Sequence, residues 1–304
     1  MTTAPRLPNF IVIGTARAGT TALYHALRQH PQVYMSPVKE PRFFAYDRPT
    51  PNYAGPLDHE VVAHSILEPG AYALLFEGAG GARAVGEATP LYLTMTGAAK
   101  RIATALPGVR LIALLRQPAD RAWSHYLLNV RQGIEPLRSF RQALSQEESR
   151  VRALWSPRWW YQRRGHYDGQ VRAYLNHFGP DRIRFYRYED WRHYPLEVWR
   201  DLCAFLEVDK AFVPTFETVN ASAYPRLWGL HRAACRLRSS QLAQRSRPAR
   251  AASSVFWRAY RKCNLVRPPR LDPEIRDELT QGYSDSILRT QDLIGLDLSG
   301  WLVG

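Results

Sequence analysis

The sequence predicts an α/β fold with a central parallel sheet flanked by helices. Short, uninterrupted apolar runs, typical of strands buried on both faces, alternate with segments whose apolar residues recur at helical spacing. Such alternation favours parallel strands joined by crossover helices. The chain has 304 residues, of which 45% are hydrophobic, so it is long enough to bury one large core. We therefore expect a single domain over residues 1–304.

The first part of the predicted fold is a strand, a tight turn, a helix and a second strand. Residues 10–13 form a short apolar, β-branched run that ends at Gly14. A helix is expected from Thr20, because apolar residues repeat on one face until Pro31 ends the pattern. The second strand covers residues 33–35.

Two further strands and two helices are predicted beyond this unit. The almost wholly apolar run 109–115 ends at Arg116, and Pro118 stands where the first turn of a helix should begin. Residues 182–188 have the composition of another strand. A last helix is expected to start at Asp272, which has the side chain of an N-cap and is followed by a proline.

The charge of the chain points to an anionic partner. The formal net charge is +14, and residues 226–270 contain twelve Arg or Lys residues and no Asp or Glu. We interpret this stretch as a basic helical segment of the same domain. A nucleotide, an acidic polymer and a membrane surface all remain compatible with the charge.

Cysteine content and the lack of a secretory signal or an apolar run of transmembrane length predict a cytoplasmic protein. The three cysteines are widely spaced and contain no C-x-x-C pair, which favours a reducing compartment. The sequence before residue 10 lacks the apolar core of a secretory signal, and no apolar run approaches the roughly 20 residues of a transmembrane helix.

The turn over residues 14–21 is the strongest candidate for a ligand site. It joins the first strand to the first helix, where unpaired helix amides point beyond the carboxyl ends of parallel strands. Its two glycines let the backbone curl around an anion, the hydroxyls of Thr20 and Thr21 add donors, and Arg17 adds a positive charge. These features predict a phosphate cradle.

Two departures separate this cradle from the nucleotide triphosphatase P-loop that its spacing resembles. Thr20 occupies the position of the P-loop lysine, and the strand over 109–115 ends in Arg116 instead of a magnesium-binding acid. Both changes suit a phosphate bound without a metal. A P-loop-type nucleotide kinase and a basic nucleic-acid-binding protein are nevertheless kept as alternative functions.

Two segments resemble those of sulfotransferases that use 3′-phosphoadenosine 5′-phosphosulfate (PAPS), nearest to the carbohydrate and heparan-sulfate branch. Residues 14–23 are similar to the family's 5′-phosphosulfate loop, and residues 116–126 to its 3′-phosphate segment. The resemblance implies a P-loop-like sulfotransferase fold, PAPS as donor, adenosine 3′,5′-bisphosphate as product and no metal. It implies that the donor is bound by Thr15, Ala16, Arg17, Ala18, Gly19, Thr20, Thr21, Arg116, Ser124 and Arg226.

A third segment, Lys-Glu-Pro-Arg-Phe-Phe at residues 39–44, resembles the element that carries the general base in that branch. The resemblance places the base on Glu40, with Glu87 as a second candidate. Lys39 would steady the sulfonate oxygens, and Arg17 would stabilise the leaving phosphate. Sulfonate transfer, like phosphoryl transfer, depends mainly on positioning and fixed positive charge.

Three departures from the family pattern limit what the resemblance implies, and the one at Ala88 leaves the acceptor pocket open. Arg17 stands where animal enzymes usually have Lys, Ala88 stands where carbohydrate enzymes often have an acceptor-contacting Lys, and Arg226 lies in a loop that matches only loosely. We expect a hydroxyl or amine of a carbohydrate or small-molecule acceptor, and no nucleic-acid partner. The sequence is silent on the acceptor's identity and on the oligomeric state.

Overall fold

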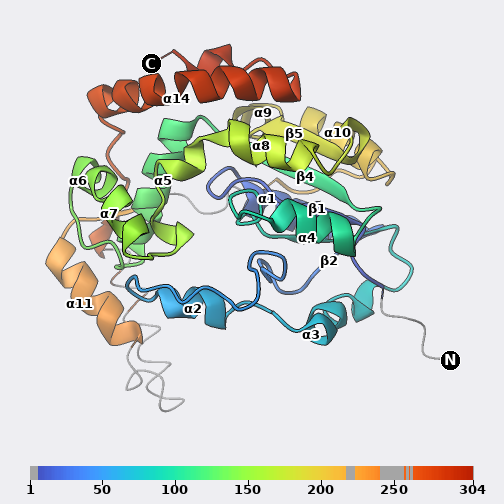
Figure 1. The fold of residues 1–304 in the computed structure, drawn as a ribbon, viewed down its shortest axis with the longest axis horizontal. Coiled ribbons are helices and arrows are strands. Elements are labelled where there is room, and N and C mark those ends of the chain that lie inside the picture. The colour runs from blue at the N-terminus through green and yellow to red at the C-terminus, as the bar shows by residue number, and fades with distance from the viewer. Residues whose placement is uncertain (1–5, 217–222, 240–256, 258–259, 261–262, 304) are drawn as a thin grey trace.

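The structure, a computed structural model, describes residues 6–216, 223–239, 257, 260 and 263–303. Its centre is a five-stranded, all-parallel sheet with the strand order β2-β3-β1-β4-β5, which confirms the predicted fold class (Figure 1). The strands are β1 (Phe10–Val12), β2 (Val33–Met35), β3 (Ala84–Ala88), β4 (Arg110–Leu115) and β5 (Ile183–Arg187).

Helices connect the strands and cover both faces of the sheet. They are α1 (Thr20–Gln29), α2 (Asp58–Ala63), α3 (Pro69–Leu74), α4 (Ala98–Ala105), α5 (Pro118–Arg131), α6 (Phe140–Ser145), α7 (Glu147–Arg152), α8 (Tyr167–Leu175), α9 (Tyr188–His193), α10 (Pro195–Phe205), α11 (Trp228–Ser239) and α14 (Pro273–Ile294). The predicted helices at Thr20, Pro118 and Asp272 are all confirmed, within a residue or two at their ends.

The core has two layers because successive strand residues point to opposite faces. In β4, Leu111, Ala113 and Leu115 pack with side chains of α4, α5, α8 and α14. Ile112 and Leu114 lie on the other face, with side chains of α1 and α10. Burial on both faces explains why β4 reads as an unbroken apolar run.

One strand, β3, is absent from the sequence-based prediction. Its sequence, Ala-Val-Gly-Glu-Ala, carries a glycine and a charge where a buried strand normally has apolar residues. Gly86 is required by packing, because a Cβ atom there would lie 2.3 Å from the ring of Phe10. Glu87 is fully buried beside it. The strand was missed because this polar group has partners that only the fold provides.

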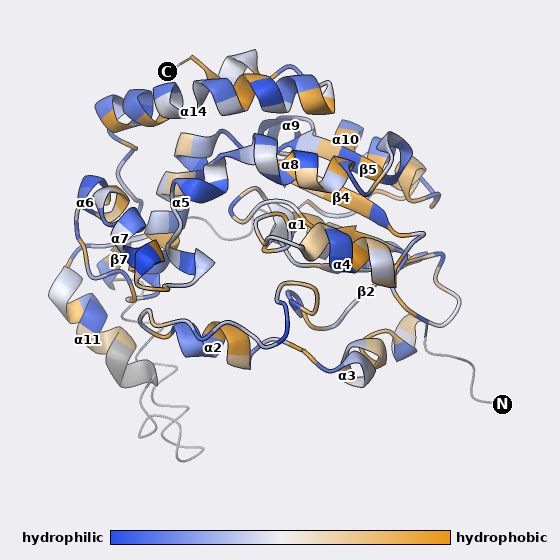
Figure 2. Cartoon of the chain, in the orientation of Figure 1, coloured by the Kyte–Doolittle hydropathy of each residue, from blue (hydrophilic) through white to orange (hydrophobic). Residues whose placement is uncertain are grey.

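The last helix, α14, packs across α8 and α5 (Figure 1). Its N-cap is Asp272, which accepts a 3.0 Å hydrogen bond from the amide of Glu274 as predicted. Hydrophilic and hydrophobic residues alternate along α14 (Figure 2). Much of the basic stretch 226–270 lies outside the described residues. Within it, the structure describes α11 and the strand β7 (Leu265–Val266), which pairs antiparallel with β6 (Tyr224–Pro225) just before the stretch.

Candidate active site

Predicted site residues from three separate segments share one edge of the sheet. Because all five strands are parallel, their carboxyl ends meet at the same edge, and the loops that follow them are brought together. The turn 14–21 follows β1, the turn 39–44 follows β2, and Arg116 follows β4. Tyr188 follows β5 at the same edge. The site is therefore assembled from segments that are far apart in the sequence.

The turn after β1 has the conformation expected of an anion cradle. A Cβ atom on Gly14 would lie 2.7 Å from the Cα atom of Ala113 in β4, so only glycine fits there. Arg17 and Gly19 have positive φ angles of 76° and 85°. No side chain caps the N-terminus of α1. The first amides of a helix lack intrahelical partners, so this uncapped end presents donors and the positive end of the helix dipole.

Direct contacts join the two predicted phosphate segments. The Nε atom of Arg17 donates a 3.0 Å hydrogen bond to the Oγ atom of Ser124 on α5. The guanidinium of Arg116 donates to the carbonyl oxygen of Arg17 at 3.0 Å and lies 4.7 Å from the centre of the Tyr188 ring. Arg17, Arg116 and Ser124, chosen from two separate motifs, are thus in one cluster.

Two further arginines, Arg121 on α5 and Arg164 before α8, extend this cluster although the sequence analysis assigned them no role. Both are buried. Burial, together with Arg121, lowers the pKa of Arg164 to about 9, and burial with Arg116 and other arginines lowers that of Arg17 to about 10. Within the described chain, no carboxylate oxygen lies within 4.0 Å of the guanidinium groups of Arg17, Arg116, Arg121 or Arg164.

Buried polar atoms without partners lie in the same region. The Oγ1 atom of Thr15, the first residue after Gly14 in the turn, is buried with no hydrogen-bond partner, as is the Nε atom of Arg121. Buried charges are normally paired, and buried polar atoms are normally hydrogen-bonded. An excess of buried cations and unused polar atoms is the arrangement expected where the missing partner is an anionic ligand.

The turn after β2 holds Glu40 in an ion-paired but accessible position. Its carboxylate accepts from Lys39 at 2.7 Å and from Arg42 at 3.4 Å, and its side chain is 33% exposed. Burial acts to raise the pKa of Glu40, but the two ion pairs outweigh it and hold that pKa below its usual value. Glu40 is therefore a carboxylate at neutral pH. Glu40 and Arg42 have positive φ angles of 61° and 59°, which are strained for these residues.

Glu87, the second candidate base, lies on β3 and is fully buried. Its carboxylate accepts hydrogen bonds from three hydroxyls, those of Thr89 and Tyr92 at 2.7 Å each and that of Tyr72 at 3.4 Å. Burial raises the pKa of Glu87 to about 7, although the three hydroxyls oppose the shift. Glu87 therefore differs from Glu40 in both solvent access and charge partners.

A family model described as "Sulfotransferase family" matches residues 8–212, about two thirds of the chain and all five strands of the sheet. The chain belongs to the sulfotransferase family. A sulfotransferase from Alicyclobacillus acidocaldarius has a similar structure, with a TM-score of 0.76, 32% sequence identity and 97% of this chain and 99% of that chain covered. The resemblance drawn from the sequence is confirmed.

Curated sulfotransferases match shorter segments. The membrane-associated sulfotransferase kil1 of Dictyostelium discoideum is 35% identical over 127 residues, which are 41% of this chain and 23% of kil1. The human bifunctional heparan sulfate N-deacetylase/N-sulfotransferase 2 is 31% identical over 129 residues, 41% of this chain and 13% of that protein. This sulfotransferase thus matches a quarter or less of the length of these relatives.

The remaining predicted donor residues of the sulfotransferase are placed less uniformly. Ala16, Ala18, Thr20 and Thr21 lie in the turn after β1 and the first turn of α1. Arg226 follows β6, its side chain is exposed, and the contacts of the described residues do not join that side chain to the cluster. Residues 217–222 of its loop lie outside the described residues, so the role of Arg226 stays a prediction.

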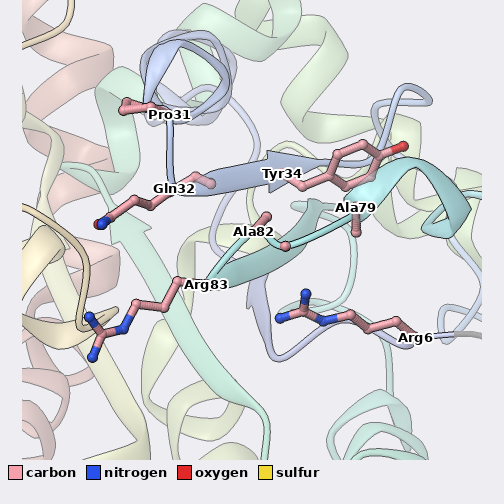
Figure 3. Close-up of a pocket in the computed structure, with 9 residues that line it drawn as sticks. Arg6, Pro31, Gln32, Tyr34, Ala79, Ala82 and Arg83 are labelled. Atoms are coloured by element: carbon pink, nitrogen blue, oxygen red, sulfur yellow. The ribbon is translucent and has the colours of Figure 1, made fainter.

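A surface cavity of about 770 Å³ is separate from this site (Figure 3). Gln32 and Arg83, which precede β2 and β3, contribute to its lining, so it lies at the amino ends of these strands. Arg6, another lining residue, donates to the carbonyl oxygen of Gly80 at 3.1 Å. Since the cradle lies at the carboxyl ends, the cavity belongs to the opposite edge of the sheet.

Among the described helices, none is long and apolar enough to cross a bilayer. In the same residues, no group of three or more His, Cys, Asp or Glu side chains is arranged to hold a metal ion.

Proposed function

We propose that this sulfotransferase takes a sulfonate group from PAPS and transfers it to a hydroxyl or amine of a carbohydrate or small-molecule acceptor. The observation that carries the proposal is the cluster of arginines without carboxylate partners at the carboxyl edge of the sheet. Adenosine 3′,5′-bisphosphate, the product left by PAPS, carries two separate phosphates. We infer that the turn after β1 and the pair Arg116 and Ser124, which are in contact, form two adjoining anion pockets, and such a pair suits this ligand better than one carrying a single phosphate.

The two pockets divide the donor between them. The uncapped N-terminus of α1, with the hydroxyls of Thr20 and Thr21, would hold the 5′ end. Arg116 and Ser124 would hold the 3′-phosphate. The hydrogen bond from Arg17 to Ser124 ties the pockets together, so that both ends of the nucleotide are bound in one register. Arg17 would also stabilise the negative charge that develops on the departing 5′-phosphate.

Glu40 would act as the general base. It is ionised at neutral pH, and its partly exposed carboxylate can reach an acceptor that enters from solvent. Its ion pairs restrict its motion and lower its basicity, so positioning must contribute much of its effect. Lys39, whose ammonium lies 2.7 Å from Glu40, would steady the oxygens of the moving sulfonate.

The acceptor side is less constrained. Ala88 is fully buried and supplies only its carbonyl oxygen, which accepts a 3.0 Å hydrogen bond from the amide of Glu40. The acceptor must therefore be bound by other groups than the lysine found in carbohydrate enzymes. We propose a cytoplasmic enzyme that needs no metal. The wide spacing of its three cysteines and the lack of a C-x-x-C pair support a reducing compartment.

Calorimetric titration with two nucleotides tests the proposal. Adenosine 3′,5′-bisphosphate should bind without any metal, and ATP with Mg²⁺ should bind much more weakly, because Thr20 replaces the P-loop lysine. Radiolabelled PAPS should then transfer label to a component of an acceptor extract. Preferential binding of ATP–Mg²⁺ would favour a nucleotide kinase and overturn the proposal.

A further inference from the structure

The buried carboxylate of Glu87 is connected to the turn that carries Glu40. Thr89, whose hydroxyl donates to Glu87 at 2.7 Å, accepts a hydrogen bond from the backbone N–H of Arg42 at 3.4 Å. Tyr92, which also donates to Glu87 at 2.7 Å, accepts from the N–H of Phe44 at 3.3 Å. Two chains of hydrogen bonds therefore run from one carboxylate to two backbone amides of the turn.

The turn needs this support. A left-handed conformation costs roughly 1–2 kcal/mol for a residue other than glycine, and two such residues, Glu40 and Arg42, lie in this turn. Strained backbone persists only where surrounding contacts hold it in place. The contacts here include the bonds of Arg42 and Phe44 to the two hydroxyls and the bond from the N–H of Glu40 to the carbonyl of Ala88. These three bonds all come from β3 or the segment that follows it, whereas the carbonyl of Pro41 accepts from the N–H of Ile66 at 2.8 Å.

The negative charge of Glu87 determines which groups donate and which accept in both chains of hydrogen bonds. A hydroxyl has one proton, and an ionised carboxylate can only accept. The hydroxyls of Thr89 and Tyr92 therefore give their protons to Glu87 and leave their lone pairs for the amides of Arg42 and Phe44. A neutral amide or a protonated carboxyl would offer a competing proton to these oxygens and weaken the bonds to the turn.

We propose that Glu87 is a positioning residue, whose carboxylate, acting through the hydroxyls of Thr89 and Tyr92, holds the strained turn that presents Glu40. The proposal rests on the proposed function only in assigning the general base to Glu40. It gives Glu87 no contact with the acceptor, in keeping with its complete burial. It also explains why a charged residue interrupts the apolar sequence of β3.

Hydrogen exchange of the full-length protein, monitored at the amides of Arg42 and Phe44, tests the positioning without reference to catalysis. Glu87→Gln and Thr89→Val should speed exchange at Arg42 about tenfold, the effect of losing one hydrogen bond. Thr89→Ser keeps the hydroxyl and should exchange like the wild type. Tyr92→Phe, a milder change than the one at Glu87, should speed exchange at Phe44. Exchange in α14, remote from the turn, is the internal control.

Measurements of kcat and of nucleotide affinity in the Glu87 variant test the same proposal through catalysis. Glu87→Gln should lower kcat at least tenfold and leave the affinity for adenosine 3′,5′-bisphosphate within twofold of wild type. The pH dependence of kcat distinguishes a positioning role of the Glu87 carboxylate from a general loss of structure in the variant. Burial raises the pKa of Glu87 to about 7, opposed by Tyr72, Thr89 and Tyr92 and reinforced by the charge of Glu40. Wild-type kcat should therefore fall below about pH 7, and Glu87→Gln should lack this limb.

The possible outcomes separate this proposal from the proposed function. Unchanged exchange at residues 40–44 in Glu87→Gln, Thr89→Val and Tyr92→Phe would overturn the positioning role. Loss of turnover in Glu87→Gln with unchanged exchange would also overturn it, because Glu87 would then act directly on the reactants. Faster exchange in a protein that transfers no sulfonate from PAPS would support the hydrogen-bond chains and refute the proposed function instead.

Discussion

The two halves of the carboxyl edge balance their charges differently. On the β1 and β4 side, Arg17 and Arg116 have no carboxylate partner among the residues that the structure describes, and buried polar atoms are left unsatisfied. On the β2 and β3 side, Glu40 is paired with two cations, and Glu87 accepts from three hydroxyls. We propose that an anionic ligand supplies the partners that the first region lacks. The second is complete by itself, and so can hold a reactive carboxylate in a defined position.

The largest expected effect comes from the balanced side. Glu40→Gln should lower kcat by about 10²–10⁴-fold, because it removes the base but preserves the side chain's size. Binding of adenosine 3′,5′-bisphosphate, measured by calorimetry, should be nearly unchanged. Glu77→Gln, a change at an exposed carboxylate, serves as the control. Normal turnover by the Glu40 variant would show that the base lies elsewhere.

On the unbalanced side, Arg17→Met should separate stability from activity. Burial and neighbouring arginines lower the pKa of Arg17 to about 10, so its charge is less favourable in the free folded protein than in the unfolded chain at neutral pH. Removing the charge should raise the melting temperature of the free protein by a few degrees. Sulfonate transfer should fall about 10²–10³-fold.

Thermal denaturation and a PAPS-dependent transfer assay of the same Arg17→Met preparation provide both readings. A variant that is less stable than the wild type without ligand would contradict the unbalanced charge assigned to this side.

An intermediate effect is expected from the ion pairs around Glu40. Lys39→Met removes a cation that lowers the pKa of Glu40, so that pKa should rise. Because the base must be deprotonated, the acidic limb of kcat due to Glu40 should move to higher pH. In wild type this limb should lie below the ordinary value for glutamate. A pH–rate profile in which the limb stays in place would show that Lys39 does not set the charge of Glu40.

The smallest effect is expected at Thr15. Its hydroxyl has no partner in the free protein, so Thr15→Val should leave the melting temperature unchanged or slightly raised. If the nucleotide supplies the missing partner, affinity for adenosine 3′,5′-bisphosphate should fall about two- to tenfold, the worth of one neutral hydrogen bond. Unchanged affinity would mean that the hydroxyl does not face the ligand.

The sequence predicts best those features that its local pattern encodes. β1, β2 and β4 are visible as apolar runs, β5 is visible from its strand-like composition, and Pro118 and Asp272 mark the starts of α5 and α14. The convergence of Arg17, Arg116 and Ser124 follows from the rule that loops after parallel strands share one edge.

Features that depend on tertiary partners could not be predicted in this way. β3 contains Glu87, and one of the hydroxyls that donate to it belongs to Tyr72 of α3, a separate element. The burial of Arg121 and Arg164 is likewise set by packing between distant segments. Arg121, Ser124 and His125 do form a polar group at helical spacing on α5, and this signal could have identified Arg121. The single-domain organisation and the acceptor stay predictions.

We propose above that the arginines without carboxylate partners bind both ends of a doubly phosphorylated adenosine. The most direct test of this proposal is calorimetry with adenosine 3′,5′-bisphosphate and with adenosine 5′-monophosphate, using wild type, Arg116→Ala and the exposed control Arg172→Ala. Wild type and control should bind the bisphosphate more tightly than the monophosphate. In Arg116→Ala the ratio of the two affinities should fall about ten- to hundredfold. Equal binding of both nucleotides by wild type, or an undiminished ratio in Arg116→Ala, would contradict the proposal.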